Sequence, residues 1–139
     1  MQHGEAIPPL GAIYCPQVMV IRDSVTGLLS AAPFSVSVIA ASLRCCAESE
    51  VLSNKEKQFL EDKVASVLNV AADNKVTLLV LGAWGCGAFG NSPLAVAGAF
   101  KRVLRTYQGL FTCVVFAILP GENLDAFITT FGEDVIVAP

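Results

Sequence analysis

The chain has 139 residues, a formal net charge of −3, and 54% hydrophobic against 15% charged residues. The length predicts a single domain over residues 1–139, and the acidic balance argues against a nucleic-acid-binding protein with a broad basic surface. No apolar run approaches the roughly 20 residues that span a bilayer, so we expect no membrane segment. The high apolar content indicates buried parallel strands, or an apolar face that partner segments cover.

The five cysteines and the single histidine limit the possible chemistry. No C-x-x-C pair occurs and His3 is close to the terminus, so we predict neither a metal site nor a Cys–His nucleophile pair, and no cofactor. Residues 1–9 lack the basic start and the apolar run of a signal peptide. The sequence therefore predicts a reducing, intracellular location. We expect the cytoplasm or, in a eukaryote, the nucleus as an alternative.

The first third of the chain predicts a loose lead-in followed by two strands. The lead-in covers residues 1–12 and contains Pro and Gly. Residues 13–23 contain a short strand, and the turn-like residues 24–27 follow it. Residues 34–42 alternate well enough for a second strand. The plainest interpretation of this region is a surface hairpin.

A long helix is predicted from about residue 54 to residue 73. Ser53 and Glu56 form a capping box at its start, with Ser53 as the N-cap. Lys57 and Glu61 have the i,i+4 spacing of an ion pair, which contributes only a few tenths of a kcal/mol. One face carries an apolar stripe, which consists of Phe59, Leu60, Val64, Val67, Leu68 and Ala71.

The stretch that follows this helix organises the whole chain. An apolar run from Leu78 to Leu81 predicts a fully buried strand, because a parallel strand that is covered on both faces needs no polar alternation. A loop with glycines at positions 82, 85, 87 and 90 comes next. Ser92 then serves as an N-cap and Pro93 as the first residue of a helix.

This order of strand, glycine loop and helix start predicts an anion site, with phosphate as the expected ligand. Backbone N–H groups at a helix start carry partial positive charge, and glycines let the backbone curl around a ligand. No lysine lies between Lys75 and Lys101, which excludes the P-loop pattern. A plain glycine-rich turn is the structural alternative.

The spacing Gly85-x-Gly87-x-x-Gly90 also matches the dinucleotide fingerprint in form. A Rossmann fold needs an acidic residue about 20 positions further on to hold the ribose hydroxyls. No Asp or Glu occurs between Asn91 and Gly121, so the context argues against a dinucleotide site.

The last third predicts a helix from 93 to about 107, a second buried strand at 112–119 and a short helix with Asn123 as its N-cap. Residues 135–137 are expected to be a last edge strand or a tail. The element order indicates an α/β fold with a mainly parallel or mixed sheet and helices on both faces. Ligands of such sheets bind at the carboxyl ends of the strands, where the glycine loop lies.

Residues 80–93, VLGAWGCGAFGNSP, closely resemble the diphosphate-binding loop of the microbial-type poly(ADP-ribose) glycohydrolases. These are macrodomain-related enzymes that remove ADP-ribose polymers from proteins. Their strand leads into Gly-Ala-Trp-Gly-Cys-Gly-x-Phe-Gly-Asn. Residues 14–23 also resemble the family's Tyr-Ser-Pro-x-Val-x-Val-Phe-Arg-Asp, with Cys15 in place of the serine and Ile21 in place of the aromatic residue. The resemblance implies a three-layer, macrodomain-like fold that is truncated at its N-terminal side.

The resemblance also implies a binding site for ADP-ribose. The amides from Gly85 to Gly90 would hold the diphosphate, and Phe89 would pack against the ribose beside the scissile bond. Trp84 and Cys86 are expected to form the wall of the loop more than to touch the ligand. The expected ligand-binding set is Gly85, Cys86, Gly87, Ala88, Phe89, Gly90 and Asn91.

The catalytic signature of the family does not occur in this sequence. That signature is a Gly-Gly-Gly run followed shortly by Gln-Glu-Glu, whose second glutamate protonates the leaving group. The chain contains no Gly-Gly, Gln-Glu or Glu-Glu pair, so we name no catalytic residue. Either the sequence is a piece of a longer enzyme, or it is a short natural form that kept the loop and lost the chemistry.

Three functions are consistent with these observations. The first is a catalytically incomplete domain that binds ADP-ribose, or poly(ADP-ribose) on modified proteins. The second is an active glycohydrolase whose acid comes from upstream residues. The third is a non-catalytic interaction or scaffold protein that keeps the α/β core. None of the three predicts direct contact with nucleic acid or a membrane.

Overall fold

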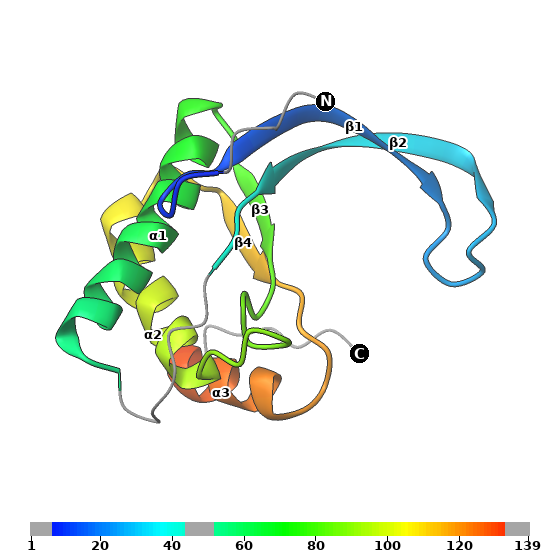
Figure 1. Cartoon of the computed structure of the whole chain (residues 1–139). Helices are drawn as coiled ribbons and strands as arrows, with labels where there is room; N and C mark the ends of the chain where they lie inside the picture. The colour runs from blue at the N-terminus through cyan, green and yellow to red at the C-terminus, as the bar shows by residue number, and fades with distance from the viewer. Residues whose placement is uncertain (1–6, 44–51, 133–139) are drawn as a thin grey trace, which may run out of the picture.

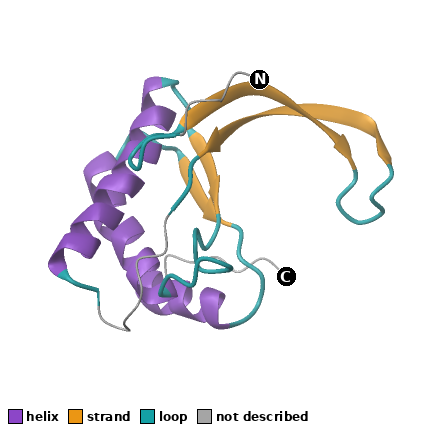
Figure 2. Ribbon diagram, viewed as in Figure 1, coloured by secondary structure: helices purple, strands orange, loops and turns teal. Residues whose placement is uncertain are grey.

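The computed structural model describes residues 7–43 and 52–132, and Figure 1 shows their arrangement. The expected last strand at 135–137 lies outside the described residues. The elements in chain order are β1 (Ile13–Arg22), β2 (Leu29–Ala40), α1 (Asn54–Asp73), β3 (Leu78–Leu81), α2 (Pro93–Leu104), the 3-10 helix η1 (Arg105–Tyr107), β4 (Cys113–Phe116) and α3 (Glu122–Phe131). The structure is therefore a mixture of helices and strands, as the sequence predicts, but the described strands form two small sheets instead of the single expected sheet (Figure 2).

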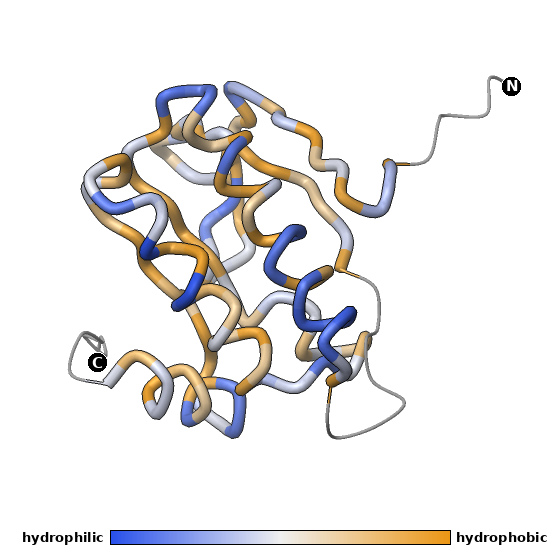
Figure 3. The backbone as a smooth tube through the Cα atoms, turned by 90° about the vertical axis from the view of Figure 1, so that its left-hand side faces the viewer, coloured by the Kyte–Doolittle hydropathy of each residue, from blue (hydrophilic) through white to orange (hydrophobic). Residues whose placement is uncertain are grey.

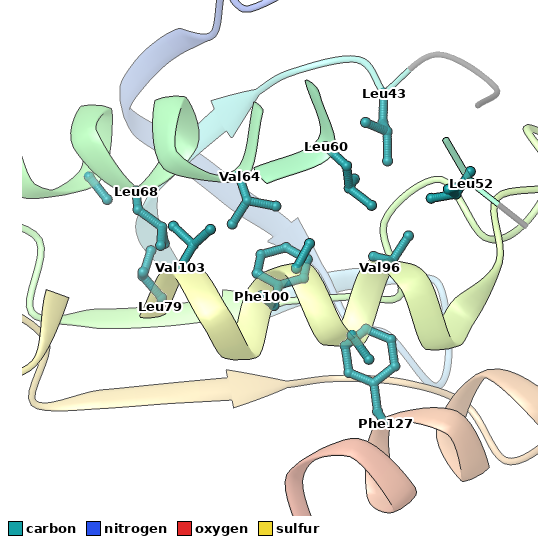
Figure 4. Close-up of a cluster of buried hydrophobic side chains, with 13 residues drawn as sticks. Leu43, Leu52, Leu60, Val64, Leu68, Leu79, Val96, Phe100, Val103 and Phe127 are labelled. Carbon is teal, nitrogen blue, oxygen red and sulfur yellow. The ribbon is translucent and has the colours of Figure 1, made fainter. Parts of the chain in front are cut away.

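The three helices and the β3–β4 sheet form the body of the molecule. β3 and β4 are parallel, with Leu78 opposite Cys113 and Leu81 opposite Phe116. α1 and α2 pack against each other and α3 packs on α2. Their apolar side chains meet in one core (Figure 4), which includes Leu60, Val64, Leu68, Leu79, Val96, Phe100, Val103 and Phe127.

Phe116 of β4 joins the helices to the sheet. Its ring centroid lies 5.3 Å from that of Phe100 on α2, and 5.0 Å and 5.1 Å from those of Phe127 and Phe131 on α3. Aromatic pairs at these separations add to the stabilisation that burial alone gives. The end of β4 is thereby fixed to both helices, and with it the end of β3, its partner in the sheet.

The long helix begins and ends where the sequence predicts. The Ser53 hydroxyl accepts a hydrogen bond from the Glu56 amide at 3.3 Å, and the Glu56 carboxylate accepts one from the Ser53 amide at 2.7 Å, which confirms the capping box. Figure 3 shows hydrophilic and hydrophobic segments alternating along α1. Its apolar stripe faces α2, as an amphipathic helix requires.

β1 and β2 form an antiparallel hairpin that curves away from the helices (Figure 1). Asp23 accepts hydrogen bonds from the amides of Val25 and Thr26, and the Arg22 guanidinium donates to the Gly27 carbonyl at 2.8 Å. These bonds close the turn, and the hairpin interpretation is confirmed. Most side chains along both strands are exposed.

Three expectations about burial and capping are wrong. The strand predicted at 112–119 is shorter and is not buried, because Val115 is 44% exposed and Leu119, beyond the end of β4, is 86% exposed. Residues 78–81 are not buried on both faces: Leu79 faces the helices, but Leu78 and Val80 are 58% and 63% exposed. The reason is that α1 and α2 cover one face of β3, and the described part of the chain leaves the other face open. Asn123 does not cap the last helix either, because α3 begins at Glu122 with Gly121 as its N-cap, and the φ of 134° at Gly121 sets the turn.

Candidate functional site

The glycine loop lies at the carboxyl end of β3 and leads into α2. Ser92 is the N-cap of α2, and its hydroxyl accepts a hydrogen bond from the Ala95 amide at 3.4 Å. Pro93 occupies the first helical position, where its missing N–H has no consequence. The predicted order of strand, loop and capped helix is therefore confirmed, and the start of α2 is adjacent to the loop.

A pair of residues closes the base of the loop. The Gly85 carbonyl accepts hydrogen bonds from both the backbone amide and the side-chain amide of Asn91, at 3.1 Å and 3.0 Å. Gly85 has a φ of +73°, and a Cβ there would lie 2.7 Å from Asn91 Nδ2 and 2.9 Å from Leu43 Cδ2. Only glycine fits at this position. Gly85 and the buried Asn91 therefore shape the loop, and their polar groups already bond to each other.

The tip of the loop, from Gly87 to Gly90, is exposed. It is closed by a hydrogen bond from the Gly90 amide to the Gly87 carbonyl at 2.8 Å. Within the part of the chain that the structure describes, the amides of Gly87, Ala88 and Phe89 have no acceptor. A Cβ on Gly87 would meet no atom within 4 Å. The tip thus presents three consecutive backbone donors to solvent, without side-chain bulk at Gly87, which is an arrangement suited to an anion.

The Phe89 side chain is 53% exposed at this tip. No ring contact of Phe89 is found among the described residues. An aromatic ring in this position is free to pack against the apolar face of a ligand.

Trp84 and Cys86 form the half-buried wall of the loop. The Cys86 thiol lies 3.7 Å from the Trp84 carbonyl, to which it donates a weak hydrogen bond. Burial raises the pKa of Cys86 to about 11. The thiol is therefore protonated near neutral pH and is not a candidate nucleophile.

Lys63 of α1 lies against this wall, and its role was not predicted from the sequence. Its ammonium lies 5.9 Å from the centroid of the Trp84 ring and donates a 2.6 Å hydrogen bond to the Gly11 carbonyl. Burial lowers the pKa of Lys63. The available signal was its position three residues after Leu60 and four before Val67, inside the apolar stripe of α1.

A hollow of about 270 Å³ lies beside the start of the loop. It is lined by the ends of β2 and β3 and by the wall of the loop, from Ile39 and Ala41 across to Trp84. Residues 120–123, which follow β4, are not part of its lining. No Asp or Glu among the described residues lines this hollow, and no group of three His, Cys, Asp or Glu in the described ranges could hold a metal ion.

None of the helices in the described ranges combines the length and the apolar character of a membrane span. No protein-family model and no curated protein sequence matches the chain. Solved structures do match. A poly(ADP-ribose) glycohydrolase from Deinococcus radiodurans in complex with ADP-ribose is 37% identical, with a TM-score of 0.75, over 89% of this chain and 53% of that one.

A second similar structure, a poly(ADP-ribose) glycohydrolase from Thermomonospora curvata, is 35% identical, with a TM-score of 0.77, over 88% of this chain and 47% of that one. The chain therefore spans about half the length of the glycohydrolases that it matches. These comparisons confirm the resemblance seen in the sequence, and they confirm a macrodomain-like α/β fold.

Proposed function

We propose that this chain, a relative of the microbial-type poly(ADP-ribose) glycohydrolases over about half of their length, binds ADP-ribose through its glycine loop. The observation that carries the proposal is the set of consecutive exposed amides at Gly87, Ala88 and Phe89, which have no acceptor among the described residues. Structures with which the chain shares 36–37% identity were solved with ADP-ribose bound. Free ADP-ribose, and ADP-ribose units on modified proteins, are the ligands that this chemistry fits.

In this proposal the diphosphate lies against the loop tip. The amides between Gly85 and Gly90 donate to its oxygens, and the positive end of the α2 dipole favours the negative charge. The loop contains no lysine, so the backbone supplies the recognition. Gly87 matters most among the glycines of the tip, because a side chain there would occupy the space from which the ligand approaches.

The exposed ring of Phe89 would pack against the ribose next to the diphosphate. Trp84 and Cys86 keep the loop in shape without touching the ligand. Cys86 and Asn91 therefore belong to the site through the structure of the loop, and the contacts to ADP-ribose come from the tip.

We propose binding without hydrolysis for the 139 residues alone. Cleaving a glycosidic bond requires a positioned carboxyl group that protonates the leaving oxygen. The sequence has no Gly-Gly-Gly and Gln-Glu-Glu signature, and no carboxylate of the described residues lines the hollow beside the loop. Residues outside this sequence that bring such an acid to the loop would make the assembled protein a glycohydrolase.

A scaffold function is the second candidate, and the exposed apolar side chains of the hairpin favour it.

For either function we propose an intracellular location, because the exposed Cys113 is a free thiol that an oxidising compartment would not preserve.

The experiment that tests the proposal is a titration of the chain with ADP-ribose, followed by the fluorescence of Trp84, the single tryptophan. We expect saturable binding that is at least tenfold tighter than that of AMP, which lacks the second phosphate and ribose. The Gly87→Val variant should lose this binding and keep its fold, since a Cβ at Gly87 meets no atom within 4 Å.

The matched control is Ala32→Val, which adds similar bulk to an exposed position on β2. It should bind as the unmodified chain does. Equal affinity of the Gly87→Val and Ala32→Val variants would contradict the proposed site. No binding by a folded chain would leave the scaffold function as the better explanation. Incubation with poly(ADP-ribose) should release no ADP-ribose; release by the 139-residue chain would show an acid that lies elsewhere.

A further inference from the structure

The two sheets of the molecule leave a groove between them. Val36–Ile39 of β2 and Leu78–Leu81 of β3 both line a groove of about 750 Å³. The smaller hollow continues it past Ile39 and Leu81 to the wall of the glycine loop. Val36 and Leu78 line only the groove, whereas the later residues Ala41 and Gly82 line only the hollow, so the chain runs in the same direction along the end of β2 and along β3. Figure 1 shows the end of β2 approaching β3 without joining its sheet.

Each side of this groove is a strand with only one partner. In the described part of the chain, β2 pairs only with β1 and β3 pairs only with β4. An unpaired edge presents backbone N–H and C=O groups that another strand can bond. Two such edges beside one groove are the geometry for adding a strand between them.

The hydrogen bonds between β3 and β4 identify which groups are free. The carbonyls of Thr77 and Leu81 accept from the amides of Cys113 and Ala117, at 3.2 Å and 2.7 Å. Successive residues of a strand direct their backbone groups to opposite edges. The N–H and C=O groups of Leu78 and Val80 therefore point to the edge away from β4.

Apolar side chains of β2 and β3 line much of the groove, beside the polar residues Tyr14, Ser37, Asn74, Lys75 and Thr77. Leu78 and Val80 on β3, and Val36 and Val38 on β2, are all exposed. A row of exposed apolar residues on an open strand edge marks an interaction surface or an aggregation hazard. An occupant with apolar side chains would bury these residues and satisfy the free backbone groups at the same time.

We infer that this groove receives an extended polypeptide strand that pairs with β2 and β3 together and joins the two sheets into one. The occupant is polypeptide from outside the 139 residues, of the kind that fills the unmatched half of the similar structures, since this chain covers only 53% of the Deinococcus radiodurans glycohydrolase. The end of the inserted strand lies beside the wall of the glycine loop. This inference stands on the sheet edges and does not depend on what the loop binds.

Hydrogen exchange tests the inference with an internal control. The probe is the part of the Deinococcus radiodurans glycohydrolase that has no counterpart in this chain, produced as a separate polypeptide and mixed with the complete 139-residue chain. The amides of Leu78 and Val80 should exchange at least tenfold more slowly in the mixture. The amides of Leu79 and Leu81 already face β4 and should change little.

Two results would overturn the inference. One is that, at a saturating concentration of the probe, exchange at the Leu78 and Val80 amides slows no more than exchange at the Leu79 and Leu81 amides. The other is slow exchange of Leu78 and Val80 that depends on the concentration of this chain alone, which would make a second copy the occupant.

A substitution on the free edge gives an independent test. Val80→Pro removes the backbone donor of Val80, and proline is tolerated on an edge strand. Val80→Thr, the matched control, changes the same exposed side chain and keeps the donor. We expect Val80→Pro to weaken capture of the probe at least tenfold and Val80→Thr to change it less than threefold. Equal capture by both variants would exclude backbone pairing, and if Val80→Pro fails to fold, the exchange pattern of the unmodified chain decides.

Discussion

The glycine loop and the β1–β2 hairpin are stabilised in opposite ways. The loop is short, and its base is held from within the chain: Asn91 donates to the Gly85 carbonyl, and Leu43 packs against the same glycine. The hairpin is longer, its two strands pair with each other along one edge only, and many of its apolar side chains are exposed. The base of the loop finds its partners inside the described part of the chain, whereas the hairpin does so along one edge of each strand.

The difference shows how much surrounding structure each region needs. A loop between a strand and a capped helix needs the helical body and little else, so it retains its shape. A long apolar hairpin needs a surface to cover it, and the described residues supply only part of one. The loop is therefore the self-sufficient part of the molecule, and the hairpin is the part whose apolar side chains the described residues leave uncovered.

The largest expected effect comes from comparing two phenylalanines across this divide. Phe100 is 1% exposed and packs edge-to-face on Phe116, whereas Phe34 on the hairpin is 57% exposed. Phe100→Ala should lower the free energy of unfolding by about 3–5 kcal/mol, the usual cost of emptying a core aromatic site. Phe34→Ala should lower it by less than about 0.5 kcal/mol. Urea unfolding, followed by circular dichroism, measures both.

The second comparison lies within the loop. Gly85→Ala places a Cβ 2.7 Å from Asn91 Nδ2 at a φ of +73°, so we expect a loss of about 2 kcal/mol in unfolding free energy. Gly87→Ala meets open space and should change stability by less than about 0.5 kcal/mol. For variants that remain folded, the affinity for ADP-ribose should follow the reverse order. Gly87→Ala should weaken binding more than Gly85→Ala, because Gly87 is at the proposed contact. Similar stability of the two variants would show that Gly85 does not determine the shape of the loop.

Local rules made the self-sufficient regions predictable from the sequence. The capping box at Ser53 sets the first turn of α1, and Ser92-Pro93 sets that of α2, because each cap depends on residues only three positions apart. The strand and the glycine loop between these helices followed from an apolar run and from glycine spacing. The similar structures then confirmed the fold that the loop sequence implied.

Other features depended on partners distant in the sequence. The sequence alone predicts Leu78 and Val80 to be core residues, but their exposure depends on whether a second layer covers the sheet. Lys63 can be buried because the Gly11 carbonyl, 52 positions away, accepts a hydrogen bond from its ammonium. The start of α3 is set by the positive φ of Gly121, a conformation that glycine allows but that its presence alone does not specify.

The Cys86 thiol provides a pH-dependent probe of the loop wall. Its pKa is about 11 in the folded chain, above the ordinary value of 9.0 that applies when the chain is unfolded. Between these values the unfolded chain releases a proton that the folded chain retains, so the free energy of unfolding falls as pH rises. We expect a loss of at most about 2 kcal/mol from pH 9 to pH 11, because the thiol is only partly buried.

Urea titrations at several pH values measure this loss, and Cys86→Ala is the control. The difference in stability between the unmodified chain and Cys86→Ala should be constant below pH 9 and should narrow above it. A difference independent of pH would mean that the thiol is solvated and that the loop wall is open.

The smallest expected effect concerns the ion pair between α1 and α2. The i,i+4 spacing suggested Lys57 as the partner of Glu61, but Glu61 Oε1 lies 2.5 Å from Arg102 Nε on the neighbouring helix. More than half of the Arg102 side chain is exposed, so solvent and salt screen the attraction. Glu61→Gln should therefore lower the free energy of unfolding by no more than about 0.5 kcal/mol, and 1 M NaCl should abolish the difference.

Asp62→Asn is the matched control for this pair. It removes the same unit of charge from the next position of α1, where the carboxylate accepts a hydrogen bond from Gln58 on its own helix. If Asp62→Asn shows the same salt-dependent loss as Glu61→Gln, the effect reflects net charge alone. A loss confined to Glu61→Gln would show that the two helices are joined by this contact, and that the body supporting the glycine loop owes part of its rigidity to a surface pair as well as to its core.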